Sequence, residues 1–155
     1  MQSKKELFNN LSQEVEEILI LPGKSEQKLK EICELLVDNI HYYDWVGFYL
    51  VDGLKKELVL GPFVGDSTEH TRIPFGQGIC GQAAEKERTI IVQDVKKETN
   101  YLACAPEVNS EIVVPIFKSG KVTAELDIDS HAFSPFTWED REFLEYLCKI
   151  IADLT

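Results

Sequence analysis

A single hairpin sequence, from Glu111 to Asp129, constrains the fold of this chain more than any other stretch. Two runs rich in apolar and β-branched residues flank Lys118-Ser119-Gly120-Lys121, which predicts two antiparallel strands over 111–117 and 122–129. Successive side chains of a strand point to opposite faces, so the second strand carries acids on one face and apolar residues on the other. The acids are Glu125, Asp127 and Asp129, and the apolar residues are Ala124, Leu126 and Ile128.

The acidic face has two interpretations. It could be an ordinary solvated face. However, neighbouring carboxylates on one strand face repel one another, and this electrostatic cost is easier to explain when a cation or a proton sits among them. Glu111 on the first strand decides whether a pocket forms. A two-residue loop at Ser119-Gly120 would pair Glu111 with Ile128 on the opposite face, whereas a three-residue loop or a bulge would place it with the aspartates. A shared acidic pocket needs the second arrangement.

Two further strands are predicted over 45–51 and 58–64. Pro62 fits an edge or a bulge better than a central ladder position, because it has no N–H to donate. Trp45 and Tyr49 share one face of the first strand. They could be ordinary core residues, or the apolar wall of a small-molecule pocket, where an indole or a phenol adds one directed hydrogen bond to its contact area.

A glycine-rich segment, 75–81, holds Cys80. Its three glycines allow backbone conformations closed to other residues, but it lacks the Gly-Lys-Ser/Thr ending of a phosphate loop. A helix is predicted to begin near Gln82, which puts Cys80 at the N-terminal end of that helix. Unpaired amides and the helix dipole favour an anion there and can lower the pKa of this thiol.

The other three cysteines fall into two groups. Cys33 and Cys148 lie on the apolar faces of predicted helices and are interpreted as small buried hydrophobes. Cys104 lies in a polar segment, 93–107, that is predicted to be a loop. Cysteines in a reducing compartment rarely form structural bridges, so we expect any pair that oxidises to do so transiently.

Helices are predicted at both ends of the chain. Apolar residues recur every three or four positions over 4–19 and again after Ser25, which can cap the second helix, and Thr137-Trp138-Glu139-Asp140 resembles a capping box. The order helix, helix, strands, short helix, strands, helix predicts an α+β fold, an antiparallel sheet flanked by N- and C-terminal helices. A chain of 155 residues supports one packed core, so we expect a single domain over residues 1–155.

Charge and hydropathy exclude several partners. The net charge of -11 opposes binding to nucleic acid or to an anionic membrane. The sequence has neither a run of eighteen apolar residues nor a basic-then-apolar opening, so we expect a cytoplasmic protein. Its amphipathic terminal helices would also allow a homodimer.

Taken together, the order of elements and the motifs resemble a GAF domain and, within that superfamily, the free methionine-(R)-sulfoxide reductases, which reduce the sulfoxide of the free amino acid. The resemblance covers roughly residues 45–130 and includes the 24-residue spacing between Cys80 and Cys104. The matching segments are Trp45-Val-Gly-Phe-Tyr49, Leu58-Val-Leu-Gly-Pro-Phe63, Ile73-Pro-Phe-Gly-Gln-Gly-Ile-Cys-Gly81, Ala103-Cys104, Ser110-Glu-Ile-Val-Val-Pro-Ile116 and Leu126-Asp-Ile-Asp-Ser130.

The resemblance implies a role for each candidate residue. It implies Cys104 as the attacking cysteine and Cys80 as its resolving partner. It further implies that Trp45 and Tyr49 hold the methyl and thioether end of the substrate. The acids implied as the polar, catalytic side of the same pocket are Glu111, Asp127 and Asp129. No cofactor and no metal are implied, and the implied reductant is thioredoxin or a similar dithiol.

The chain departs from the family pattern at several positions. His70 stands where the family often has a third redox cysteine, so this chain must work with two cysteines or use an external thiol. We interpret His70 as an exposed loop histidine in preference to a general acid. Ala124, Glu125, Tyr101 and Ala105 replace a usual glycine, an apolar residue, a histidine and an aspartate. These changes affect the loop contacts with substrate more than the core chemistry.

Sulfoxide reduction suits these residue types. A thiolate attacks the sulfur while the oxygen accepts a proton, and the oxygen finally leaves as water once a second thiol has reacted. Crowded carboxyl groups cannot all stay ionised, so one of them can donate a proton, and the remaining negative charge can bind the ammonium group of a free amino acid. The attack leaves a sulfenic acid on Cys104, which a second thiol converts to a disulfide.

Two rival interpretations remain open. A stand-alone GAF sensor would bind a small molecule without turnover, and a GAF-fold interaction protein would carry its thiols incidentally, because fold does not determine function. A sensor needs neither two cysteines that can meet nor acids at Glu111, Asp127 and Asp129. Free methionine sulfoxide is therefore the preferred ligand.

Overall fold

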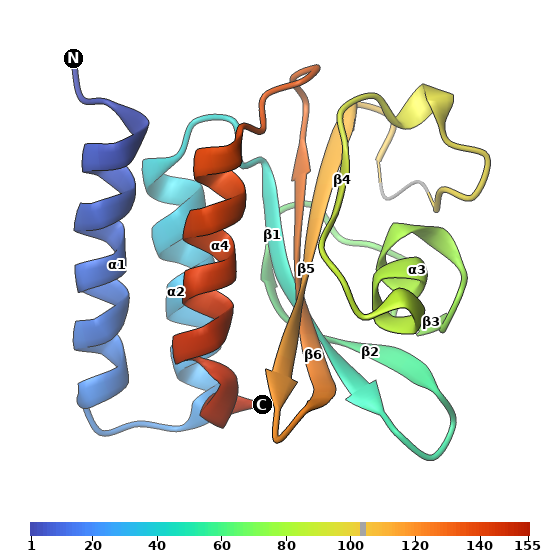
Figure 1. Ribbon diagram of the computed structural model, residues 1–155, viewed down its shortest axis with the longest axis horizontal. Helices are drawn as coiled ribbons and strands as arrows, with labels where there is room; N and C mark the ends of the chain where they lie inside the picture. Colours follow the sequence, from blue (N-terminus) through green and yellow to red (C-terminus); the bar gives the residue numbers. More distant parts are fainter. Residues whose placement is uncertain (103–104) are drawn as a thin grey trace.

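The computed structural model describes residues 1–102 and 105–155. Cys104, the predicted attacking cysteine, lies outside the described residues. The described part of the chain forms one six-stranded sheet in the order β3-β2-β1-β6-β5-β4, in which every neighbouring pair is antiparallel (Figure 1). The strands are β1 (Trp45–Asp52), β2 (Glu57–Val64), β3 (Arg72–Pro74), β4 (Ile90–Val92), β5 (Ser110–Lys118) and β6 (Lys121–Ser130). The α-helices are α1 (Lys4–Ile20), α2 (Ser25–Asn39), α3 (Gly78–Lys86) and α4 (Trp138–Ile150), and the 3-10 turns are η1 (Val95–Lys97) and η2 (Ala152–Leu154).

Three helices cover one face of this sheet. α2 and α4 pack on the strands, and α1 lies outside them and contacts both (Figure 1). The rings of Phe8 and Phe143 stack between α1 and α4 with centroids 4.4 Å apart. Cys33 and Cys148 are buried in the same core, as predicted. The predicted α+β fold, with N- and C-terminal helices against an antiparallel sheet, is confirmed.

The start of α4 is tied to the rest of the chain through one buried acid. The backbone N–H of Thr137 donates to Oδ2 of Asp140 at 2.9 Å, which confirms the predicted capping box. Oδ1 of Asp140 accepts hydrogen bonds from the hydroxyls of Tyr42 and Tyr43, at 2.7 and 2.8 Å. The ammonium of Lys4 lies 2.7 Å from Oδ2. Asp140 is therefore a fully paired structural carboxylate.

The starts of two helices differ from prediction. Ser25 is the first residue of α2 and makes no side-chain cap, so the predicted cap is wrong. α3 begins at Gly78, four residues before the predicted start at Gln82. The helical hydrogen bond from the N–H of Gly81 to the carbonyl of Gln77, at 3.0 Å, extends the helix back into the glycine-rich segment.

The β5–β6 hairpin settles the position of Glu111. Ser119 and Gly120 have φ angles of 54° and 78°, which fits a two-residue turn of type I′. A bulge next to Ile116 then shifts the register, so Glu111 pairs with Asp129. Without the bulge, the two-residue turn would put Glu111 on the opposite face. The arrangement that a shared acidic pocket requires is the one observed.

The face assignments in β1 are confirmed. Val46 and Phe48 point into the core under the helices, while Trp45 and Tyr49 point to the other side of the sheet. In the β1–β2 ladder, Gly61-Pro62 stands opposite Phe48 as a bulge, so Pro62 occupies one of the two positions expected for it.

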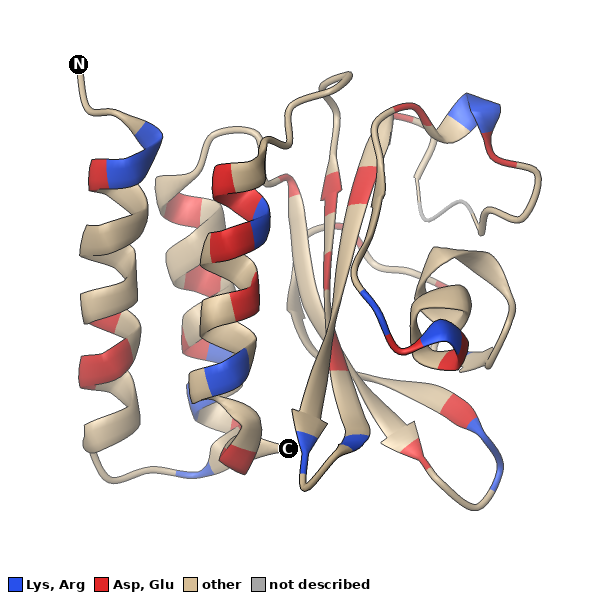
Figure 2. Ribbon diagram, viewed as in Figure 1, with Lys and Arg blue, Asp and Glu red and all other residues tan. Residues whose placement is uncertain are grey.

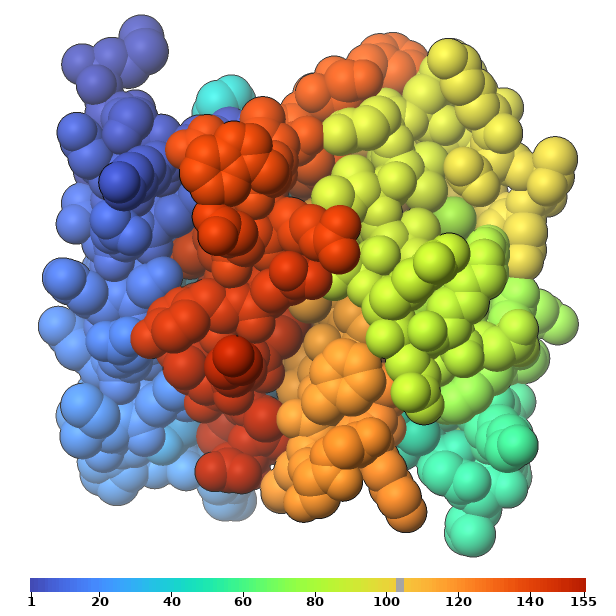
Figure 3. Space-filling model, in the orientation of Figure 1, coloured from blue at the N-terminus to red at the C-terminus, as the bar shows by residue number. Residues whose placement is uncertain are grey.

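α3 and the segments around it cover the second face of the sheet (Figure 1). In the space-filling view, the orange end of the β5–β6 hairpin shows at the surface between the red α4 and the yellow-green segments (Figure 3). No helix in the described ranges is both long and apolar enough to cross a bilayer. The apolar faces of α1 and α4 are covered within this chain, and the homodimer remains a prediction.

Candidate active site

The face of the sheet beneath α3 carries a three-by-three grid of side chains. Residues directly opposite each other in an antiparallel ladder point to the same face, so the pairing of β1, β6 and β5 fixes the rows. The rows are Trp45, Asp129 and Glu111, then Gly47, Asp127 and Val113, then Tyr49, Glu125 and Pro115. The three acids of β6 therefore run down the middle of the grid, between an aromatic column and a column headed by Glu111.

All four acids of the grid are buried. The exposed fractions are 5% for Glu111, 0% for Glu125, 1% for Asp127 and 1% for Asp129, so the solvated-face interpretation is wrong. Figure 2 shows acidic positions along β5 and β6, whereas the basic positions of this hairpin lie at its turn. This arrangement concentrates negative charge where water cannot screen it.

Burial controls the ionisation of these acids. Desolvation raises the pKa of Glu125 well above its usual range, and the charge of Asp127 raises it further. Desolvation also raises the pKa of Asp127, although hydrogen bonds with Glu111 and Cys80 oppose that rise. Both shifts favour the protonated carboxyl groups, so the grid contains groups that can donate protons.

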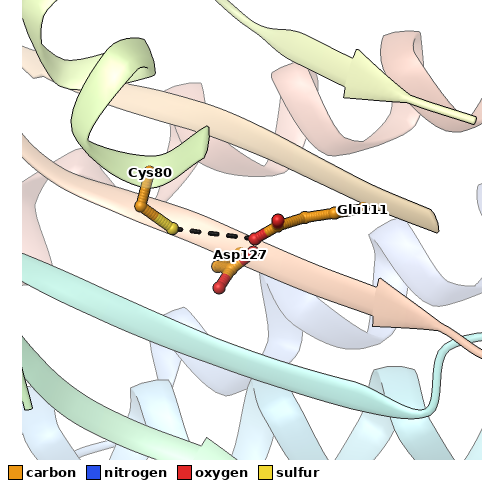
Figure 4. Close-up of side chains that lie close together, drawn as sticks. All are labelled: Cys80, Glu111 and Asp127. Atoms are coloured by element: carbon orange, nitrogen blue, oxygen red, sulfur yellow. Dashed lines mark hydrogen bonds between the residues drawn. The ribbon is translucent and has the colours of Figure 1, made fainter. Parts of the chain in front are cut away.

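Cys80 projects from the first turn of α3 onto the acids. Its Sγ lies 3.8 Å from Oε2 of Glu111, to which the thiol donates a hydrogen bond (Figure 4). Burial raises the pKa of Cys80 well above its usual value, and the charges of Asp127 and Glu111 raise it further. The expected lowering is therefore wrong, because the favourable effect of a helix N-terminus is small compared with burying a thiolate among acids.

Cys80, Glu111 and Asp127 also have the composition of a cation site. One potential ligand atom from each lies within 4.8 Å of the others, and all three residues are buried (Figure 4). Groups this close together can also share protons. The raised pKa values of Cys80 and Asp127 favour their protonated forms. We therefore describe this cluster as a proton-sharing site.

The grid opens onto two cavities. The inner cavity has a volume of about 10 Å³, roughly the room for one water molecule. Tyr49, Cys80, Glu111 and Asp127 lie in its wall. The outer cavity has a volume of about 140 Å³ and is lined by residues that include Trp45, Asp129, Ala105 and His131. The structure thus brings six predicted site residues to one place: Trp45, Tyr49, Cys80, Glu111, Asp127 and Asp129.

Gly47 positions the indole of Trp45, a role that the sequence analysis missed. A Cβ atom at Gly47 would lie 2.4 Å from Cη2 of Trp45, so the ring occupies the space above this glycine. The indole stacks on Phe63, with centroids 5.4 Å apart, and its Nε1 donates to the carbonyl of Asp66 at 3.0 Å. Because Gly47 stands two residues after Trp45 on the same strand face, the alternation could have revealed it.

Tyr49 and His70 are linked at the inner cavity. The Tyr49 hydroxyl donates to the carbonyl of His70 at 2.9 Å, and the N–H of His70 donates to Oγ1 of Thr68 at 3.1 Å. His70 is half-buried and lies in the cavity wall, so its interpretation as an exposed loop histidine is wrong.

Asn100 holds the loop that leads toward Cys104 against α3, and the sequence analysis missed it. Its Oδ1 accepts the N–H of Gly78 at 2.8 Å, and its Nδ2 donates to the carbonyl of Gly76 at 2.8 Å. Leu102 contacts the position where a Cβ of Gly78 would lie and contributes to the wall of the inner cavity. An asparagine in a polar loop gives no sequence signal for such a contact.

Comparison with known proteins identifies the relatives of this chain. Residues 25–154 match the family model described as GAF domain. The chain is 38% identical to GAF domain-containing protein A of Dictyostelium discoideum, over 96% of this chain and 92% of that protein. It is 37% identical to the free methionine-R-sulfoxide reductase of Saccharomyces cerevisiae, over 92% and 87%. The free methionine-R-sulfoxide reductase of Neisseria meningitidis, solved in complex with its substrate, superposes with a TM-score of 0.86 at 36% identity, over 97% of this chain and 87% of that one.

Proposed function

The chain belongs to the GAF-domain family and, within it, to the free methionine-(R)-sulfoxide reductases, and from this premise we propose that it reduces free L-methionine (R)-S-oxide to methionine at the grid beneath α3. One observation carries the proposal: the thiol of Cys80 lies in the same buried pocket as Glu111 and Asp127, beside an aromatic wall. A pocket of this composition supplies both a redox thiol and protons for a departing oxygen.

Substrate recognition follows from the two sides of the grid. Trp45 and Tyr49, whose rings stack with centroids 6.4 Å apart, offer an apolar surface for the methyl and thioether end. Asp129 lies in the wall of the outer cavity and can bind the ammonium group. A methionine sulfoxide inside a peptide has a neutral backbone nitrogen in place of the ammonium. The negative pocket therefore favours the free amino acid.

The first chemical step transfers oxygen from the substrate to Cys104. The Cys104 thiolate attacks the sulfoxide sulfur with its electron pair, and a protonated acid, for which Asp127 is the best candidate, donates a proton to the sulfoxide oxygen. Transfer of the hydroxyl to the cysteine sulfur breaks the substrate sulfur–oxygen bond. Methionine is released with its sulfur reduced, and Cys104 is left as a sulfenic acid.

The second step uses Cys80. Its thiol condenses with the sulfenic acid, forming a disulfide and releasing water. Cys80 must lose its proton in this step, and Glu111, which already accepts a hydrogen bond from it, is placed to take that proton. The raised pKa of Cys80 keeps it a thiol until then, which protects it from attack by other oxidants.

An external dithiol must then reduce the disulfide. Thioredoxin or a similar protein suits this task, and a reducing cytoplasmic compartment suits the three buried free cysteines of the described residues, Cys33, Cys80 and Cys148. Leu102 and Ala105, the described residues on either side of the segment with Cys104, line the inner and the outer cavity. This placement supports Cys104 as the nucleophile.

An NADPH-coupled thioredoxin assay tests the proposal. We expect turnover of free methionine (R)-sulfoxide, little turnover of the (S) epimer, and loss of turnover when the substrate is N-acetylated. Cys104→Ser should abolish turnover but keep substrate binding, measured by calorimetry. Binding without turnover in the unmodified protein would instead indicate a sensor, and equal rates with the acetylated substrate would refute the ammonium argument.

A further inference from the structure

Glu125 is a buried acid that the proposed chemistry does not use. Its side chain is fully buried, and neither Oε1 nor Oε2 has a hydrogen-bond partner in the described part of the chain. A carboxyl group placed there needs an explanation, since burial without a partner is unfavourable.

The neighbours of Glu125 on the sheet offer it no counter-charge. Opposite it on β5 is Pro115, which has a hydrocarbon side chain and no N–H to donate, and opposite it on β1 is Tyr49, whose hydroxyl donates to the carbonyl of His70. No ion pair among the described residues involves Glu125. An ionised Glu125 would therefore be unpaired, and the protonated form is favoured.

Asp127 is the next side chain along the same face of β6. Residues two apart on one strand face are roughly 6.6 Å apart along the strand, and the longer glutamate side chain can span much of that gap. Oδ1 of Asp127 also lacks a hydrogen-bond partner in the described ranges. Two buried carboxyl groups with unpaired oxygens thus stand side by side, and only Asp127 reaches the inner cavity.

We propose that Glu125 is a positioning residue: its carboxyl group is coupled by charge to that of Asp127, so one proton is distributed over the two acids, and Asp127 stays available in its protonated form as the acid that faces the sulfoxide oxygen. The use of that proton depends on the proposed function, but the shared proton itself is a property of the resting protein. When the pair has lost one proton, the remaining one still resides on Asp127 for part of the time. Without Glu125, Asp127 would lose its proton at the first ionisation.

The other groups facing this pair act in the same direction. Cys80 faces it from α3, Tyr49 from β1, Glu111 from β5 and Asp129 from β6, and Cys148 approaches Glu125 from α4 across the sheet. These groups are neutral or negative, so none of them favours ionisation of the pair. The pair therefore retains a proton to higher pH than one acid would alone.

The test compares Glu125→Gln with a matched control. Gln keeps the shape but cannot carry the proton, and Glu31→Gln makes the same side-chain replacement at an exposed acid of α2. The infrared band of protonated buried carboxyl groups at pH 7 should lose intensity in Glu125→Gln only. The alkaline limb of the kcat/KM profile should move to lower pH by roughly one unit in Glu125→Gln and stay in place in the control.

Each outcome is decisive. An unchanged infrared band or an unmoved alkaline limb in Glu125→Gln would overturn the proposal. If the unmodified protein reduces no sulfoxide, the proposed function fails, but the infrared experiment still decides whether Glu125 carries a proton. Should Glu125→Gln not fold, Glu125→Val also removes the carboxyl group and must show the same two effects.

Discussion

Replacing Gly47 with alanine should displace the Trp45 indole from the pocket wall. The added Cβ would lie 2.4 Å from Cη2 and 2.7 Å from Cζ3 of Trp45, and 2.7 Å from Cβ of Phe63. Carbon atoms in contact are about 3.5–4.0 Å apart, so the indole must move by roughly 1 Å or more. Neither the strand backbone nor Phe63 can absorb this displacement easily, because both are packed in the β1–β2 ladder.

The expected effect on activity is larger than the effect on stability. A displacement of about 1 Å in a substrate-positioning group can cost on the order of 100-fold in rate, so kcat/KM for free methionine (R)-sulfoxide should fall by roughly that factor. Overpacking a tight site costs about 1–3 kcal/mol, so the free energy of unfolding should fall by that amount. Steady-state kinetics and chemical denaturation measure the two effects.

Two further variants complete this test. Gly53→Ala is the matched control, because a Cβ at Gly53 would meet nothing within 4 Å, and we expect wild-type kinetics and stability. Gly47→Ala combined with Trp45→Phe should regain stability, because the smaller phenyl ring leaves room for the added Cβ. The double variant should not regain activity. Wild-type kcat/KM in Gly47→Ala would refute the assignment of Trp45 to the substrate wall.

Three other predictions concern the thiol, the loop and the buried acid. Cys80→Ser should complete a single turnover and then stop, leaving a sulfenic acid that dimedone traps; sustained thioredoxin-coupled turnover would contradict the resolving role. Asn100→Ala should leave the Gly78 N–H and the Gly76 carbonyl unpaired, which costs about 1–3 kcal/mol of folding free energy for each group that stays buried. Hydrogen exchange of the Gly78 amide should become faster, and an unchanged exchange rate would argue against the role of Asn100. The folded-state pKa of Glu125 is raised, so its destabilising effect is absent below its unfolded pKa and grows as pH rises above it. Glu125→Val should therefore raise the free energy of unfolding more at pH 8 than at pH 4. An equal effect at both pH values in denaturant titrations would mean that Glu125 does not carry a raised pKa.

Local patterns predicted much of the fold because they act through neighbouring residues. The alternation in β6 assigned Glu125, Asp127 and Asp129 to one face, and the pairing confirms it. The capping box at Thr137 is equally local, because its partners are three residues apart. Helix starts were less certain, since a glycine-rich segment can either end or begin a helix.

The amino-acid sequence by itself determined the elements, the face on which each side chain of a strand lies, and the motifs that identify the family. Only the tertiary structure decided which faces meet. The bulge beside Ile116 brought Glu111 to Asp129, and α3 buried Cys80 on the acids and reversed its expected pKa shift. These outcomes depend on solvent exclusion and on contacts between segments far apart in the chain, and periodicity along the chain carries no information about either.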